Sequence, residues 1–220
     1  MTGLASFSRR AVLPVLAAAI TLPGSAVAAG TRIDIALTPE PPGFAPAGFT
    51  QARTGHGAAS DWRIRAVADT NVLEQTATDP TDYRFPLAIY QNLSAADLEV
   101  SVRFKAIAGR VDRAGGLAIR LRDPDHYYVV RANALEDNVN FYRVANGIRQ
   151  EIAGVSVKAA SGVWHDLGLR AEGDRFAILF NGVTLFQATD RTFPAAGKIA
   201  LWTKADSLTQ FAGLSVTTQP

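Results

Sequence analysis

Residues 117–134 read LAIRLRDPDHYYVVRANA, and this stretch decides the fold class. Its two halves, LAIRLR and HYYVVRANA, have the length and pattern of strands, in which successive side chains point to opposite faces. Between them, Asp123, Pro124 and Asp125 form a reverse-turn sequence, because Asp and Pro favour turn geometry. The stretch therefore predicts two antiparallel strands joined by a tight turn.

Further turn signals repeat along the chain. Asn146-Gly147 and Asn181-Gly182 each separate two strand-like runs, and Asn-Gly is the strongest short hairpin signal because both residues tolerate positive φ. We expect strands over residues 62–68, 97–106, 117–122, 126–134, 139–145, 148–152, 164–171, 175–180, 183–188, 199–204 and 210–216. About a dozen strands at a spacing of roughly 8–12 residues predict an antiparallel sandwich or barrel.

The composition supports a folded core without cysteine chemistry. Of the 220 residues, 48% are hydrophobic and 19% are charged, which is enough apolar material for a core. The chain has no cysteine, so disulfides, thiolate zinc sites, iron–sulfur clusters and cysteine nucleophiles are excluded. His56, His126 and His165 are too far apart in sequence to form a close-spaced metal-binding pair.

The first 29 residues read as an export signal. Arg9 and Arg10 precede an apolar stretch and a segment of small residues, and cleavage after Ala28 or Ala29 fits the small-residue rule. The arginine pair fits a twin-arginine signal, and an ordinary secretory signal that carries two arginines is the alternative. We therefore expect a periplasmic or secreted protein.

After the signal, two parts are expected. Residues 30–60 are rich in proline and glycine and predict an irregular lead-in, whereas residues 61–220 predict the sandwich domain. Removing residues 1–29 takes away two arginines and no acid, leaving 22 − 2 = 20 basic residues against 20 acidic ones. Without a cluster of Lys and Arg, or a basic amphipathic helix, we expect no nucleic-acid partner and no membrane insertion of the mature chain.

Five segments carry a family resemblance. They are PTDYRFP (80–86), LSAADLEVSVRFK (93–105), GGLAIRLRDPDHYYVVRANALEDN (115–138), residues 164–180 and FPAAGKIALWTKADS (193–207), of which RANALEDN and LWTKADS are the most specific strings. Over most of residues 60–217 the chain resembles a bacterial exported family with the concanavalin-A-like lectin/glucanase fold, often labelled 3-keto-disaccharide hydrolase or domain of unknown function. The resemblance implies an all-β jelly-roll β-sandwich of two curved antiparallel sheets and a saccharide-related role.

Ligands of a jelly roll commonly lie on the concave face of one sheet, and strand alternation indicates which side chains line it. In residues 199–204, Ile199 and Leu201 take the core side, which places Trp202 and Lys204 on the other. Alternation predicts a concave-face set of Arg120, Arg131, Asn133, Asn138, Asn140, Trp202 and Lys204, with Glu136 and Asp206 in adjacent loops. Amide, carboxylate and guanidinium groups bond sugar hydroxyls, and an indole stacks on sugar C–H faces. This set favours an exported carbohydrate-binding module.

Two other functions remain open. Cleavage of a 3-keto-glycoside, which the family label suggests, needs a base and an oxyanion stabiliser. Glu136 or Asp206 would be the base, with Lys204 or Arg131 as stabiliser, although the chain lacks the E-x-D-x-E strand motif of the classical glucanases. A structural envelope module without a small ligand is the third interpretation. A buried carboxylate beside Lys204 or Arg131 would favour catalysis, and a flat, solvated face would favour the structural module.

Several of these residues also have an ordinary structural explanation. Trp202 can be plain core, Asn138 can support a turn, and Tyr127 and Tyr128 are strand residues more often than stacking platforms. Oxygen ligands for calcium are offered by Asp123, Asp125 and Asp137, but no loop matches a defined calcium motif. We therefore assign no metal site and expect no cofactor.

Overall fold

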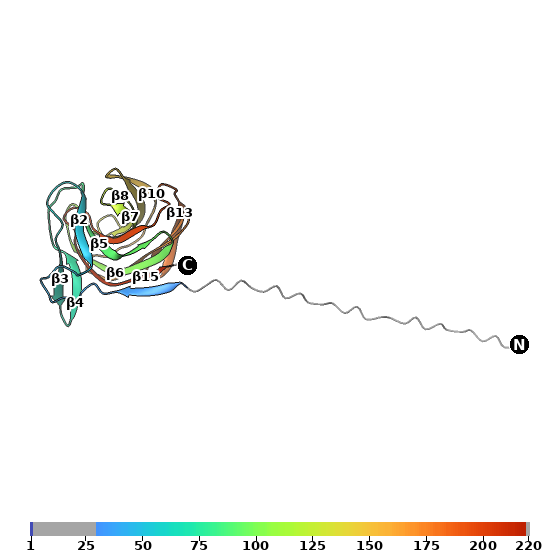
Figure 1. Ribbon diagram of the computed structural model, residues 1–220, viewed down its shortest axis with the longest axis horizontal. Coiled ribbons are helices and arrows are strands. Elements are labelled where there is room, and N and C mark those ends of the chain that lie inside the picture. The colour runs from blue at the N-terminus through green and yellow to red at the C-terminus, as the bar shows by residue number, and fades with distance from the viewer. Residues whose placement is uncertain (2–29, 219–220) are drawn as a thin grey trace.

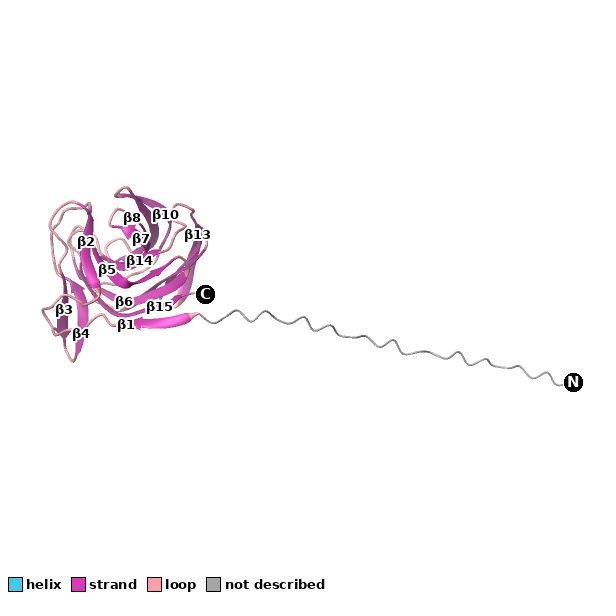
Figure 2. Ribbon diagram, viewed as in Figure 1, coloured by secondary structure: helices cyan, strands magenta, loops and turns pink. Residues whose placement is uncertain are grey.

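The computed structural model describes Met1 and residues 30–218, which form two antiparallel β-sheets stacked face to face (Figure 1). The expected export signal lies outside the described residues, apart from Met1. Within residues 30–218 every regular element is a strand (Figure 2), and none is a helix long and apolar enough to cross a membrane. The predicted all-β sandwich of two curved antiparallel sheets is confirmed.

One sheet contains eight strands. Its spatial order is β13 (Val183–Thr189), β12 (Arg175–Phe180), β11 (His165–Glu172), β6 (Leu98–Ala108), β15 (Leu208–Thr218), β4 (Thr70–Gln75) and β3 (Trp62–Val67), and β1 (Thr31–Ile35) pairs with β15. Neighbouring strands are antiparallel throughout.

The other sheet contains seven strands and carries the residues of interest. Its spatial order is β10 (Ile148–Ser156), β9 (Asn138–Ala145), β8 (His126–Asn133), β7 (Ala114–Asp123), β14 (Gly197–Trp202), β5 (Arg84–Ala95) and β2 (Phe49–Gly55). The sheet is bent, so that its edge strands β2 and β10 rise on either side of its middle strands (Figure 1). We call the side turned away from the eight-stranded sheet its concave face.

The main core lies between the sheets and follows the alternation of the sequence. In β6, Val100, Val102 and Phe104 are buried in this core, and from the seven-stranded sheet Val130 and Leu201 pack into it. Burying such side chains removes apolar surface from water, which is the main force holding two sheets together. The face assignment predicted for β14 is therefore confirmed, and β6 and β8 show the same alternation.

Both Asn-Gly hairpins are confirmed. Asn146 and Gly147 have φ of 51° and 74°, and Asn181 and Gly182 have φ of 49° and 78°. Positive φ at both central residues is the geometry of the two-residue turn whose twist matches the flanking strands. These dipeptides fix the register of β9 with β10 and of β12 with β13.

The prediction of an irregular lead-in over residues 30–60 is wrong, because this segment contributes two strands. β1 extends the eight-stranded sheet by pairing with β15, from Thr31 opposite Thr218 to Ile35 opposite Leu214. β2 forms an edge of the seven-stranded sheet beside β5. Prolines and glycines bound these strands without interrupting them, and the pairing partners are supplied from elsewhere in the chain.

The concave face carries a second apolar cluster of its own. It includes Phe85, Leu87, Tyr127, Tyr142 and Trp202, all buried. At one end of the face, hydrogen bonds join the residue before β5 to the β9–β10 hairpin. The Tyr83 hydroxyl accepts from the Arg149 backbone N–H at 2.6 Å and donates to the Gly147 carbonyl at 3.0 Å. The bent sheet therefore buries part of its concave side, and only the remainder can face a ligand.

Candidate functional site

Strands β8 and β9 place a row of polar side chains on the concave face. Arg131 lies opposite Asn140, and Asn133 lies opposite Asn138, in the antiparallel register of the two strands. Directly opposed side chains in such a pair are close enough to interact. Together with their partners they form what we call the concave polar cluster: Asp82, Asp112, Arg131, Asn133, Glu136, Asn138, Asn140, Tyr142, Glu151 and Lys204.

Arg131 is the centre of one half of the cluster. Its Nη2 donates to Oε2 of Glu136 at 2.7 Å and to the hydroxyl of Tyr142 at 3.0 Å, and its Nη1 donates to Oδ1 of Asn138. Only 3% of the Arg131 side chain is exposed, against 47% of the Glu136 side chain. The guanidinium therefore holds the Glu136 carboxylate from below while that carboxylate remains in contact with solvent.

Asn140 extends this row toward the edge strand β10. Its amide Nδ2 donates to the Tyr142 hydroxyl at 2.9 Å and to Oε2 of Glu151 at 2.8 Å. Glu151 is exposed and Asn140 is nearly buried. The row thus presents two carboxylates, from Glu136 and Glu151, supported by an amide, a phenol and a guanidinium.

Lys204 is the centre of the other half. Its ammonium Nζ lies 2.6 Å from Oδ1 of Asp82 and 2.9 Å from Oδ2 of Asp112. Asp112 is 1% exposed, and its Oδ1 accepts from Nδ2 of Asn133 at 2.8 Å. Asp112 and Asp82 lie outside the strands and carry no alternation signal, so the sequence analysis missed them; only tertiary contacts bring them to Lys204.

The charges in the cluster depend on burial and on these pairs. Burial raises the pKa of Asp112 above its ordinary value, although Lys204 and Arg131 act in the opposite direction. Burial opposes the charge on Glu136 too, but Arg131 and the Asn138 hydrogen bond outweigh it, and the pKa of Glu136 is lowered. For Lys204, hydrogen bonds to Asp82 and Asp112 outweigh desolvation and raise its pKa. Lys204 and Glu136 are therefore both ionised at neutral pH.

Asp206 has a structural role in this arrangement. Its carboxylate accepts backbone N–H groups of Arg110 at 2.7 Å, Val111 at 3.0 Å and Asp112 at 3.0 Å, so it fixes the loop that carries Asp112. Burial acts to raise its pKa, but these three backbone donors lower it overall. A carboxylate with a lowered pKa and three donors is a poor general base, which weakens the catalytic prediction for Asp206.

Trp202 lies on the predicted face but cannot serve as an exposed sugar platform. It is 0% exposed, stacks on Phe85 with ring centroids 5.2 Å apart, and donates its Nε1–H to the Tyr127 hydroxyl at 3.2 Å. The guanidinium of Arg149 lies 5.9 Å above its ring centroid. The concave curvature that closes one end of the face covers the indole. Trp202 is therefore a core residue, which was the alternative to a sugar-stacking role.

Arg120 does not lie on the concave face, and that prediction is wrong. Its side chain donates to the carbonyls of Ala96, Phe193 and Gly173, and its guanidinium lies 5.2 Å from the ring centroid of Phe176 in the other sheet. A register irregularity in β7 after Ile119, with φ of 47° at Arg120, interrupts the alternation. Such a bulge turns side chains to the other face, and a period-two pattern cannot show it.

No group of three or more His, Asp or Glu within the described residues is arranged to hold a metal ion.

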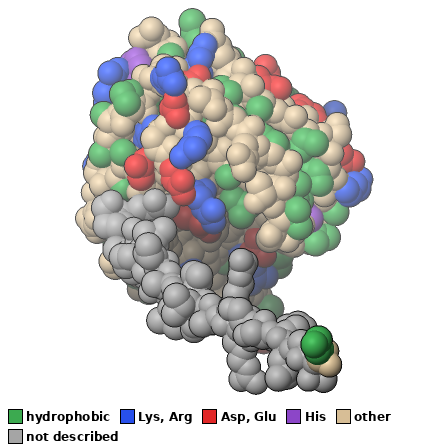
Figure 3. Space-filling model, turned by 90° about the vertical axis from the view of Figure 1, so that its right-hand side faces the viewer, with side chains coloured by type: hydrophobic (Ala, Val, Ile, Leu, Met, Phe, Trp, Pro, Cys, Tyr) green, Lys and Arg blue, Asp and Glu red, His purple; other side chains and the backbone are tan. Residues whose placement is uncertain are grey.

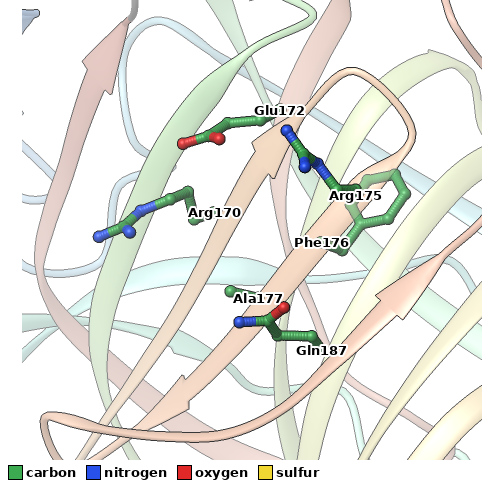
Figure 4. A pocket seen from close by; sticks show the side chains of 6 residues that line it. All are labelled: Arg170, Glu172, Arg175, Phe176, Ala177 and Gln187. Atoms are coloured by element: carbon green, nitrogen blue, oxygen red, sulfur yellow. The ribbon is translucent and has the colours of Figure 1, made fainter.

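A separate depression of about 230 Å³ lies on the outer face of the eight-stranded sheet (Figure 4). It is lined by Arg170, Glu172, Arg175, Phe176, Ala177 and Gln187, none of which belongs to the cluster. Figure 3 shows basic and acidic side chains interspersed over one face of the molecule, without a continuous patch of either sign.

Comparison with known proteins supports the fold assignment. No protein-family model matches the chain, and no curated protein sequence matches it. The carbohydrate-binding module CBM66 from Bacillus subtilis aligns with a TM-score of 0.63 at 20% identity, covering 76% of this chain and 95% of the module. Lectin II from Ulex europaeus aligns with a TM-score of 0.60 at 11% identity, covering 86% of this chain and 98% of the lectin. The β-glucanase of Bacillus licheniformis aligns with a TM-score of 0.53 at 13% identity, covering 81% of this chain and 95% of the glucanase. The chain therefore has the concanavalin-A-like jelly-roll fold, and identities this low establish the fold alone.

Proposed function

We propose that this protein is an exported carbohydrate-binding module that takes a saccharide at the concave polar cluster. The observation that carries the proposal is the row formed by Arg131, Glu136, Asn138, Asn140 and Glu151, in which buried donors hold two exposed carboxylates in place. Preorganised acceptors of this kind suit the hydroxyl groups of a sugar. Jelly rolls whose names record carbohydrate binding lend support, since CBM66 is one of them.

The proposal predicts that Glu136→Gln weakens saccharide binding about tenfold or more. Glutamine keeps the volume but removes the charge that strengthens hydrogen bonds from sugar hydroxyls. The test is a glycan array screen of the purified protein, followed by calorimetry of the best ligand with the original chain and the variant.

A matched control is Glu99→Gln on the eight-stranded sheet. Glu99 pairs with Arg170 at 2.7 Å and is 43% exposed in its side chain, close to the exposure of Glu136. This variant should bind as the original chain does. An equal loss in both variants would argue against the concave site, and no binding to any saccharide would leave the structural envelope module as the better interpretation.

A second candidate function is cleavage of a 3-keto-glycoside, and the pair of Asp112 and Lys204 favours it. A buried carboxylate with a raised pKa beside an ammonium is the arrangement expected of a tuned acid–base site. In this mechanism Glu136 would abstract the proton next to the ketone and Lys204 would stabilise the resulting enolate oxygen. Elimination would then break the glycosidic C–O bond, the proton would pass from Glu136 to the leaving oxygen, and addition of water to the unsaturated product would give the 3-keto sugar. The lowered pKa of Glu136 makes it a weak base, so binding remains the first proposal.

The catalytic candidate predicts release of a 3-keto sugar from a 3-keto-glycoside by the purified chain. Chromatography of the products over hours, with Glu136→Gln and Glu99→Gln as paired variants, measures it. Release that Glu136→Gln abolishes and Glu99→Gln leaves intact would replace binding with catalysis as the function. Absence of release, with binding retained, would exclude it.

A further inference from the structure

We propose that the concave polar cluster selects saccharides without acidic substituents and discriminates against uronate or sulfate groups. The inference deepens the proposed function and rests on it. It follows from the order of the charges in the cluster, in which both cations lie beneath and three of the four carboxylates, all but Asp112, lie at the surface.

The exposure of the paired groups establishes this order. In the pair of Arg131 and Glu136, the arginine side chain is 3% exposed and the carboxylate 47%. In the pair of Lys204 and Asp82, the lysine side chain is 11% exposed and the carboxylate 70%. Glu151 adds a third exposed carboxylate, held by Asn140. A ligand approaching from solvent therefore meets negative charge first.

The hydrogen bonds already formed leave mainly acceptors for a ligand. Oε2 of Glu136 accepts from Arg131 and Asn138, whereas its Oε1 has no hydrogen bond among the described residues. Lys204 is committed to two carboxylates, one on each side. Sugar hydroxyls can donate to the open carboxylate oxygens. A ligand carboxylate or sulfate can only accept, so at the cluster it would face like charge while Arg131 and Lys204 are already paired with carboxylates.

Two arginine donors in or beside the cluster have no hydrogen-bond partner among the described residues: Nε of Arg131 and Nη1 of Arg149. Nε of Arg131 is buried, so this donor is not presented to a ligand that approaches from solvent. The other nearby cation, Arg149, lies 4.6 Å and 4.8 Å from the ring centroids of Tyr142 and Phe85, with Nη1 buried. Its charge is directed to aromatic faces and not to the open carboxylates.

The test is a glycan array that carries neutral, uronate-containing and sulfated saccharides of matched backbone, probed with the full chain. We expect the hits to lack acidic groups and their acidic counterparts to bind at least about tenfold more weakly. Each like-charge contact at about 4 Å in water lowers the binding affinity several-fold. Preferential binding of acidic glycans would overturn the inference while leaving the proposed function standing. Absence of any saccharide binding would overturn both.

A variant makes the electrostatic cause measurable. Asp82→Asn removes the exposed partner of Lys204, so the ratio of neutral to acidic affinity should fall about fivefold or more. Glu99→Gln, on the other sheet, should leave the ratio unchanged. Because the readout is a ratio, a general loss of folded protein would not move it, and an unchanged ratio in Asp82→Asn would contradict the proposal.

Discussion

Replacing Trp202 with alanine should lower the free energy of unfolding by about 3–5 kcal/mol, the cost of removing a large aromatic side chain from a close-packed site. Trp202 is 0% exposed, stacks on Phe85 and lies near the Arg149 guanidinium, so its removal leaves a buried cavity. The substitution also removes the indole N–H that donates a hydrogen bond to the Tyr127 hydroxyl. Urea unfolding followed by circular dichroism measures the change.

Trp164→Ala provides the matched control. Trp164 is part-exposed on the eight-stranded sheet, where Arg103 and Lys105 lie 5.3 Å and 5.0 Å from its ring centroid. Its removal should cost about 1 kcal/mol or less, since cation–π contacts at exposed sites are weak. If Trp202→Ala instead left stability unchanged and abolished saccharide binding, Trp202 would be an accessible platform and its burial by the bent sheet would be refuted.

Lys204→Met should also destabilise the protein by about 3–5 kcal/mol at neutral pH, because it leaves the buried carboxylate of Asp112 without a counter-ion. Methionine keeps most of the apolar stem, so the lost charge is the main change. Adding Asp112→Asn in the same chain removes the unpaired charge and should recover much of the loss, although the amide still needs partners. The difference between the single and double variants measures the pair.

The Lys204→Met defect should shrink at acid pH. The pKa of Asp112 is already raised by burial, and losing Lys204 removes a group that lowers it. Between the unfolded and folded pKa values the folded state then binds more protons than the unfolded state, so stability rises as pH falls. Unfolding at pH 5 and pH 7.5 should show a smaller loss at the lower pH. A defect of equal size at both values would mean that the carboxylate of Asp112 is not its cause.

Much of the fold could be predicted because its signals are local. The burial of Val102, Val130 and Leu201 follows from alternation within single strands, and the two Asn-Gly turns need only their own backbone preference. The same reasoning placed Arg131 and Asn133 correctly on the concave face. It failed at Arg120, where one irregularity in β7 reversed the face, and over residues 30–60, where strands form only because β15 and β5 supply partners.

The sequence by itself determined the regularly alternating strands between clear turns, those turns, and the side of the sheet that a side chain takes where no bulge intervenes, since these depend on neighbours one to four residues away. The tertiary structure alone decided that the concave face is partly filled, which buries Trp202, and that Asp82 reaches Lys204 across 122 residues of chain. Sheet curvature and loop position are set by packing between distant segments, and such contacts leave no periodic trace in the chain.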